Sequence, residues 1–174
     1  MGASMASSPP SPRTTAVKAH VKERLLAALA ASGFFIIACV MPAMTVAAVG
    51  TTSREREMSG LEILLTGWMG AVEMNFGWYA NPLLGVALLL LLIGKDRPTL
   101  WVGTSAALVG LSSLTWFVHP LPSYDGGASV NELLYPSVGF FCWMISLCIA
   151  PLTALELASR SKASVPTPAP EPTP

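Results

Sequence analysis

The stretch that decides the fold is LLAALAASGFFIIACVMPAMTVAAV, residues 25–49. It contains no Asp, Glu, Lys or Arg. It exceeds the roughly 20 apolar residues that a helix needs to cross about 30 Å of hydrocarbon. The apolar core of a secretory signal is only about 7–15 residues long, so we interpret this stretch as an uncleaved transmembrane helix. Pro42 predicts a bend within it.

Three further apolar blocks follow along the chain. They are Trp78–Gly94, Leu100–Val118 and a block from about Leu134 to Leu155, separated by charged turns and prolines. Each block is continuous rather than alternating, so strands and a barrel are not expected. A helix also satisfies every backbone N–H and C=O group by internal hydrogen bonds, as the hydrocarbon of a bilayer requires. The sequence therefore predicts an all-α membrane protein, a bundle of four transmembrane helices.

Composition supports a membrane protein. Of the 174 residues, 52% are hydrophobic and only 11% are charged, with a mean hydropathy of +0.57. Soluble domains carry roughly 25% charged residues. The net charge is zero, and the sequence contains no block of basic residues of the kind that would indicate a nucleic-acid partner. Cys39, Cys142 and Cys148 all lie in apolar blocks without a CxxC pair, so neither a disulfide framework nor a zinc site is expected.

The two ends of the chain differ in composition from its middle. Residues 1–16 are rich in Ser, Pro and Ala and are expected to form a disordered head. Residues 161–174 end in alternating prolines and are expected to form an extended, disordered tail. The remaining residues, 17–160, are expected to form one four-span membrane domain.

The distribution of Lys and Arg predicts the orientation. Four spans place both termini on one side of the membrane, and only Arg54 and Arg56 fall on the other side. Cytoplasmic loops carry the excess of Lys and Arg, so both termini are expected on the cytoplasmic side of the membrane. The residues on the terminal side are Arg13, Lys18, Lys22, Arg24, Lys95, Arg97, Arg160 and Lys162.

The first outer loop contains an amphipathic segment at about residues 60–75. Ser59 is the expected N-cap, and Glu62, three residues later, completes a capping box. The segment is too polar to span, so we expect an interfacial helix lying flat on the bilayer. Trp68, Trp78 and Tyr79 are expected at the headgroup level, and Asn81 is expected to cap the second span. The apolar face comprises Leu61, Leu64, Leu65, Trp68 and Val72, and the polar face comprises Glu62, Thr66, Met69 and Glu73.

Six residues on the outer side are candidates for a pocket or a partner-binding surface. The carboxylates of Glu62 and Glu73 lie near a low-dielectric surface and could relay protons. Both, however, lie on the helix face that is expected to be exposed to water. His119 is the one histidine on the predicted outer side of the membrane, and a histidine side chain ordinarily titrates near neutral pH. A haem held by two histidines would also need His20, which is predicted on the opposite side. We therefore expect no catalytic residues, cofactor or metal. The six candidates are Glu62, Trp68, Glu73, Trp78, Asn81 and His119.

Three short motifs resemble those of small bacterial inner-membrane proteins of unknown function that have four spans. They are Gly67-Trp68-x-Gly70, then Trp78-Tyr79-Ala80-Asn81-Pro82, then Gly139-Phe140-Phe141-Cys142-Trp143. The resemblance covers the second half of the first outer loop, the second span and part of the fourth. It implies a bacterial inner-membrane location and implies nothing about activity.

Three functions fit these observations. The middles of the spans carry no ionisable residue, which argues against an ion-coupled pump. The favoured interpretation is a non-enzymatic accessory or scaffold subunit that binds a larger membrane partner, or a second copy of itself, in the lipid bilayer. The second is a small-solute or lipid-handling protein with an outward-facing pocket. The third is a membrane enzyme that acts on lipid.

Overall fold

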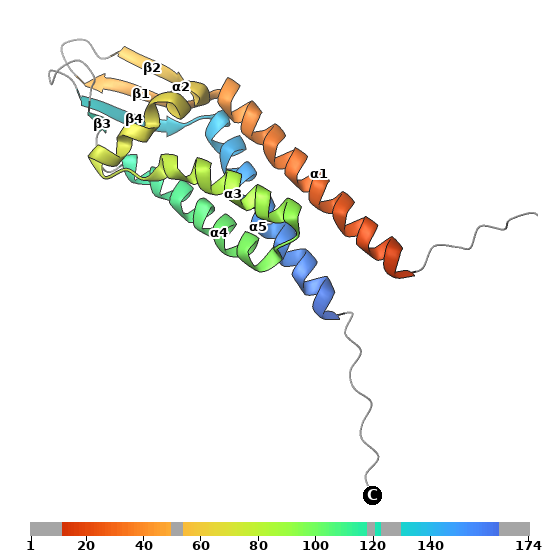
Figure 1. Cartoon of the computed structure of the whole chain (residues 1–174). Coiled ribbons are helices and arrows are strands. Elements are labelled where there is room, and N and C mark those ends of the chain that lie inside the picture. The colour runs from red at the N-terminus through yellow and green to blue at the C-terminus, as the bar shows by residue number, and fades with distance from the viewer. Residues whose placement is uncertain (1–11, 50–53, 118–120, 123–129, 164–174) are drawn as a thin grey trace, which may run out of the picture.

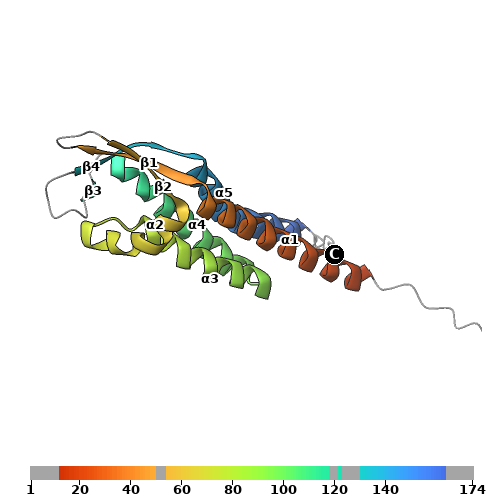
Figure 2. The same cartoon turned by 90° about the horizontal axis from the view of Figure 1, so that it is seen from above.

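Four long helices run along a common direction in the computed structural model, which describes residues 12–49, 54–117, 121–122 and 130–163. A short helix and a small sheet lie at one end of this bundle (Figure 1). The opposite end holds the start of α1, the α3–α4 turn and the end of α5 (Figures 1 and 2). The long helices are α1 (Pro12–Val40), α3 (Ala80–Ile93), α4 (Asp96–Ser112) and α5 (Val138–Ala163).

The shorter elements together form a cap on the bundle. Helix α2 (Gly60–Thr66) continues into the 3₁₀ helix η1 (Gly67–Glu73), and two more 3₁₀ helices extend the long ones, η2 (Gly77–Tyr79) before α3 and η3 (Ser113–Phe117) after α4. The antiparallel sheet has the order β2-β1-β4-β3. Its strands are β1 (Pro42–Val49), β2 (Arg54–Ser59), β3 (Leu121–Pro122) and β4 (Val130–Pro136).

The predicted all-α class is confirmed only in its coarse form, because the chain is mostly helical but also contains this sheet. The apolar block 25–49 is not one helix: α1 ends at Val40, and Pro42–Val49 is a strand. Pro42 follows the last helical turn, where a proline cannot continue the i→i−4 ladder. The backbone groups that leave the helix are paired instead by β2 and β4.

The other blocks differ from expectation at their ends. The block starting at Leu134 begins as strand β4, and α5 starts only at Val138, after Pro136. Helix α1 starts at Pro12, inside the head that was expected to be disordered. A proline is compatible with the first helical turn, because its missing N–H has no partner there. The block predicted at Trp78–Gly94 is helical over Gly77–Ile93, and the segment predicted at about 60–75 is helical over 60–73.

Two glycines hold the point where α1 changes into β1. A Cβ on Gly60 would lie 2.0 Å from the carbonyl oxygen of Ala38, and a Cβ on Gly139 would lie 2.8 Å from that of Pro42. The Gly60 amide donates to the Met41 carbonyl at 3.1 Å. Only glycine allows the backbones before α2 and at the start of α5 to approach the end of α1 this closely.

Helices α4 and α5 pack through a row of small side chains. Thr99, Gly103, Ala106 and Gly110 are buried on α4 at spacings of four, three and four residues, which places them on one face. A Cβ on Gly103 would lie 2.8 Å from Cδ of Pro151, and one on Gly110 would lie 2.5 Å from Cδ1 of Leu147. These glycines therefore allow α4 and α5 to pack closely.

An ion pair ties α1 to the α3–α4 turn at the end opposite the sheet. Nη2 of Arg24 donates to Oδ2 of Asp96 at 2.9 Å, and Nη1 donates to the Leu91 carbonyl at 3.0 Å. The side chains are only 13% and 21% exposed. Arg24 therefore neutralises a largely buried carboxylate and also satisfies a carbonyl in the last turn of α3.

The outer surface of the bundle is strongly apolar. Two helices of the described chain are long and apolar enough to cross a membrane, His20–Val40 and Val138–Ser161, and Gly77–Ile93 is a shorter apolar helix. Only 17% of the most apolar part of the helix His20–Val40 is buried within the protein. Trp101 is 75% exposed and Leu108 is 63% exposed on α4. Length and composition thus indicate membrane association for two helices.

Gly103→Ala should destabilise the protein by about 1–3 kcal/mol, because the added methyl overlaps a rigid proline ring. Thermal unfolding in mild detergent measures the change. Gly85→Ala is the matched control, since a Cβ there meets nothing within 4 Å and the substitution favours helix. Equal melting temperatures for the two variants would contradict the close packing at Gly103.

Arg24→Met should cost about 2 kcal/mol of stability, because it leaves the half-buried Asp96 carboxylate without its cation. The double variant Arg24→Met/Asp96→Asn should recover part of this loss. A double-mutant cycle on the unfolding free energy in detergent measures the coupling. A coupling energy near zero would show that the pair does not hold α1 to the turn.

Candidate functional site

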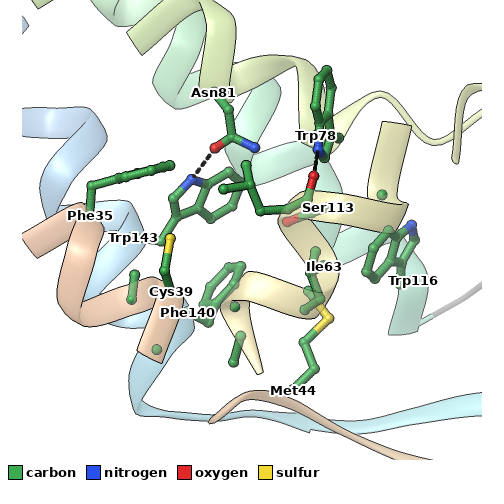
Figure 3. A pocket seen from close by; sticks show the side chains of 17 residues that line it. Phe35, Cys39, Met44, Ile63, Trp78, Asn81, Ser113, Trp116, Phe140 and Trp143 are labelled. Atoms are coloured by element: carbon green, nitrogen blue, oxygen red, sulfur yellow. Dashed lines mark hydrogen bonds between the residues drawn. The ribbon is translucent and has the colours of Figure 1, made fainter. Parts of the chain in front are cut away.

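A small cavity lies where the cap meets the bundle (Figure 3). It has a volume of about 60 Å³, enough for a few atoms or ordered water. The end of α1, helix α2, the starts of α3 and α5, and the start of η3 enclose it. Its lining is mostly apolar, and the groups that can form hydrogen bonds come from Cys39, Trp78, Asn81, Ser113, Trp116 and Trp143.

Trp78 closes one side of the cavity. Its indole Nε1 donates to the carbonyl of Leu64 at 2.8 Å, in the last turn of α2. The backbone of Gly67 lies against the ring, and a Cβ there would be 2.8 Å from Cδ1 of Trp78. The glycine therefore makes room for the indole, and the indole satisfies a carbonyl at the end of α2.

Asn81 and Trp143 meet across the cavity. Nε1 of Trp143 on α5 donates to Oδ1 of Asn81 on α3 at 2.8 Å (Figure 3). An indole nitrogen can only donate, so the amide oxygen must face it and the amide nitrogen must point elsewhere. Asn81 is therefore not the expected N-cap. It lies within the first turn of α3, whose N-cap is Tyr79.

The start of α2 follows the predicted capping pattern in part. The Ser59 side chain accepts from the Glu62 amide at 3.2 Å, as expected for the N-cap. The Glu62 carboxylate pairs with Arg56 of β2 instead of returning to the backbone of Ser59. Arg56 lies opposite Val46 in the sheet register and so on the face that carries the core. This ion pair fastens the edge strand to α2.

Asn75 shapes the connection between η1 and η2. It is 7% exposed, and its Oδ1 accepts from the Gly77 amide at 3.0 Å. Met74 before it adopts a left-handed conformation at φ 58° and ends η1. A Cβ on Gly77 would lie 2.7 Å from Cβ of Ser113. The connection thus brings Trp78 and Asn81 against η3 and α5.

The structure brings together only part of the predicted set. Trp78 and Asn81 line the cavity. Glu62 pairs with Arg56 outside its lining, and Trp68 is 56% exposed on the outer side of η1. Glu73 ends η1, but the position of its side chain is outside what the structure describes, and His119 lies outside the described residues altogether.

The residues that sequence reasoning did not select are mainly Trp143 and the glycines around the cavity. Trp143 was noted only within a motif of the resemblance. A tryptophan in an apolar helix needs an acceptor for its N–H, and that requirement was the available signal. The three motifs of the resemblance do meet in space, because Gly67 contacts Trp78 and Asn81 binds Trp143.

The described lining of the cavity is apolar apart from a few neutral polar groups. Its lining, as far as the structure describes it, includes no Asp, Glu, His, Lys or Arg. Within the described ranges no three His, Cys, Asp or Glu side chains gather where they could hold a metal ion. Of the polar groups present, the indole N–H groups of Trp78 and Trp143 and the Ser113 hydroxyl already donate to acceptors of the protein itself.

No protein family, curated protein or solved structure matches this chain. The resemblance to small four-span membrane proteins therefore stays a prediction.

Trp78→Phe should destabilise the protein by about 1 kcal/mol, because the Leu64 carbonyl loses its only side-chain donor. Trp68→Phe is the matched control, since its indole is 56% exposed and makes no hydrogen bond to the residues that the structure describes. Thermal unfolding in detergent compares them. Equal losses for the two variants would contradict a stabilising role of the hydrogen bond between Trp78 and Leu64.

Proposed function

We propose that this chain is a four-span bacterial inner-membrane protein with both termini in the cytoplasm and the cap on the outer side. The exposed apolar surface of α1 supports this proposal, because an aqueous location would leave most of that helix in water. With its 3₁₀ extension, α3 reaches about 27 Å and α4 about 35 Å. Both lengths suit a tilted or slightly short crossing of the bilayer.

The charges of the bundle agree with this orientation. Lys22, Arg24, Lys95, Arg97 and Arg160 all belong to the end that carries the termini and the α3–α4 turn. The cap carries only Arg54 and Arg56, both on β2. Positive residues accumulate on the cytoplasmic side, so the cap faces outward.

Within this arrangement the proposed role is that of a non-enzymatic accessory subunit that binds a larger membrane protein. The observation that carries it is an unpaired apolar face on α2 and η1. Leu61, Leu65 and Trp68 are 51%, 66% and 56% exposed at spacings of four and three residues. Ile63, Leu64 and Gly67, on another face, line the cavity. Apolar faces rimmed by polar residues are typical of interaction sites.

A second candidate role, lipid handling, is favoured by a separate groove between α1 and α3, which adjoins the cavity at Asn81. This role requires only the membrane location and not a protein partner.

Cysteine labelling tests the orientation. Cys39, Cys142 and Cys148 are first replaced by Ala, and Glu57→Cys in the cap or Ser159→Cys near the end of α5 is then introduced, both at exposed positions. A membrane-impermeant maleimide should label position 57 in intact cells and position 159 only after permeabilisation. The reverse pattern would overturn the orientation, and a chain that stays in the supernatant after ultracentrifugation would overturn the membrane location.

Photo-crosslinking tests the accessory role. A benzophenone amino acid replaces Leu65 in the cap or, as a matched control, Leu108 on the side of α4, where exposure is nearly the same at 63%. We expect a discrete protein adduct from position 65 and lipid adducts from position 108. Lipid adducts alone from both positions would show that α2 lies on the bilayer and would remove the basis for a partner.

A further inference from the structure

A groove of about 200 Å³ lies between α1 and α3 on the side of the bundle. The facing helices contribute side chains to its two walls. Apart from one serine hydroxyl and one amide, the lining is apolar. Ser32, Phe35 and Ile36 come from α1, and Asn81, Leu84, Gly85 and Leu88 come from α3.

The groove meets the inner cavity at its polar end. Phe35 and Asn81 line both spaces. The amide oxygen of Asn81 accepts from Trp143, which leaves the two N–H donors of its Nδ2. Nδ2 makes no hydrogen bond to any residue of the described chain. A neutral donor at the end of an apolar channel matches a ligand with a hydrocarbon chain and a neutral oxygen acceptor.

The depth of the groove follows from the position of Asn81 on α3. Asn81 lies in the first turn, two residues after Tyr79, whose exposed ring suits the interface between headgroups and hydrocarbon. Leu88 lies seven residues further along the helix, about 10 Å deeper. In the proposed orientation the groove therefore extends from the outer interface into the outer half of the hydrocarbon.

We propose that this groove binds one acyl chain of an outer-leaflet glycerophospholipid, and that the ester carbonyl of that chain accepts a hydrogen bond from Nδ2 of Asn81. The inference rests on the proposed four-span orientation. The lining contains no Lys or Arg that would hold a phosphate, so the neutral ester is the matching acceptor. A prenyl chain would fill the apolar part but would offer no carbonyl at the depth of Asn81.

Gly85 keeps the groove open. A Cβ at this position would meet nothing within 4 Å, so a larger side chain can occupy the space without displacing the helices. Gly33 on α1 has equally free surroundings but does not line the groove. Gly85→Leu and Gly33→Leu are therefore matched variants that add the same side chain to neighbouring helices, inside and outside the proposed site.

The test uses the full chain, purified in mild detergent and supplied with phosphatidylglycerol in its diester form or with the diether analogue of equal chain length. Native mass spectrometry measures the lipid retained. Wild type should retain the diester about three- to tenfold better, which is the range of one hydrogen bond. Gly85→Leu should lose retention of both lipids, and Gly33→Leu should behave as wild type.

Asn81→Asp retains an oxygen for Trp143 and removes the amide donor, so it should bind both lipids equally. Equal retention of diester and diether by wild type, unchanged retention by Gly85→Leu, or stronger retention of a prenyl alcohol would overturn the acyl-ester site. These outcomes leave the membrane location intact. Failure of the chain to sediment with membranes would instead overturn the proposed function.

Discussion

The change from helix to strand at Pro42 is the constraint on which the rest of the fold depends. The chain leaves α1 with unpaired backbone groups, and the sheet supplies their partners from β2 and β4. Gly60 and Gly139 approach the end of α1 so closely that no side chain fits at either position. The backbone at the end of α1 therefore positions the starts of both α2 and α5, and so connects the cap to the bundle.

Packing along the bundle combines buried leucines, such as Leu91 and Leu147, with rows of small residues on α1 and α4. The buried residues of α1 whose side chains are described are Ala28, Ala31 and Ala38, and α4 meets α5 through Gly103 and Gly110. Such surfaces gain from van der Waals contact between closely spaced backbones, which does not need water to drive association. Many other large apolar side chains, including Trp101, face outward. This inversion of the soluble pattern is consistent with a lipid environment.

Sequence reasoning located local features well and long-range pairing poorly. The Ser59 cap and the limits of Gly77–Ile93 follow from neighbouring residues, so pattern alone predicts them. Strand β1 depends on β4, which lies more than 80 residues later, and an apolar run does not reveal whether such a partner exists. The donor of the Asn81 hydrogen bond is likewise distant in sequence, on α5. A bend in the helix was predicted at Pro42. The helix does end there, but the chain continues as a strand rather than as a bent helix.

Among the described strands, β2 and β3 form the two edges of the sheet, and each disfavours the addition of a further strand. At one edge β2 alternates Arg54, Glu55, Arg56 and Glu57, so a second copy approaching that edge would have to desolvate a row of charges. At the other edge β3 is only two residues long and ends in Pro122, which offers no amide hydrogen. Both features disfavour pairing of this sheet with the sheet of a second copy.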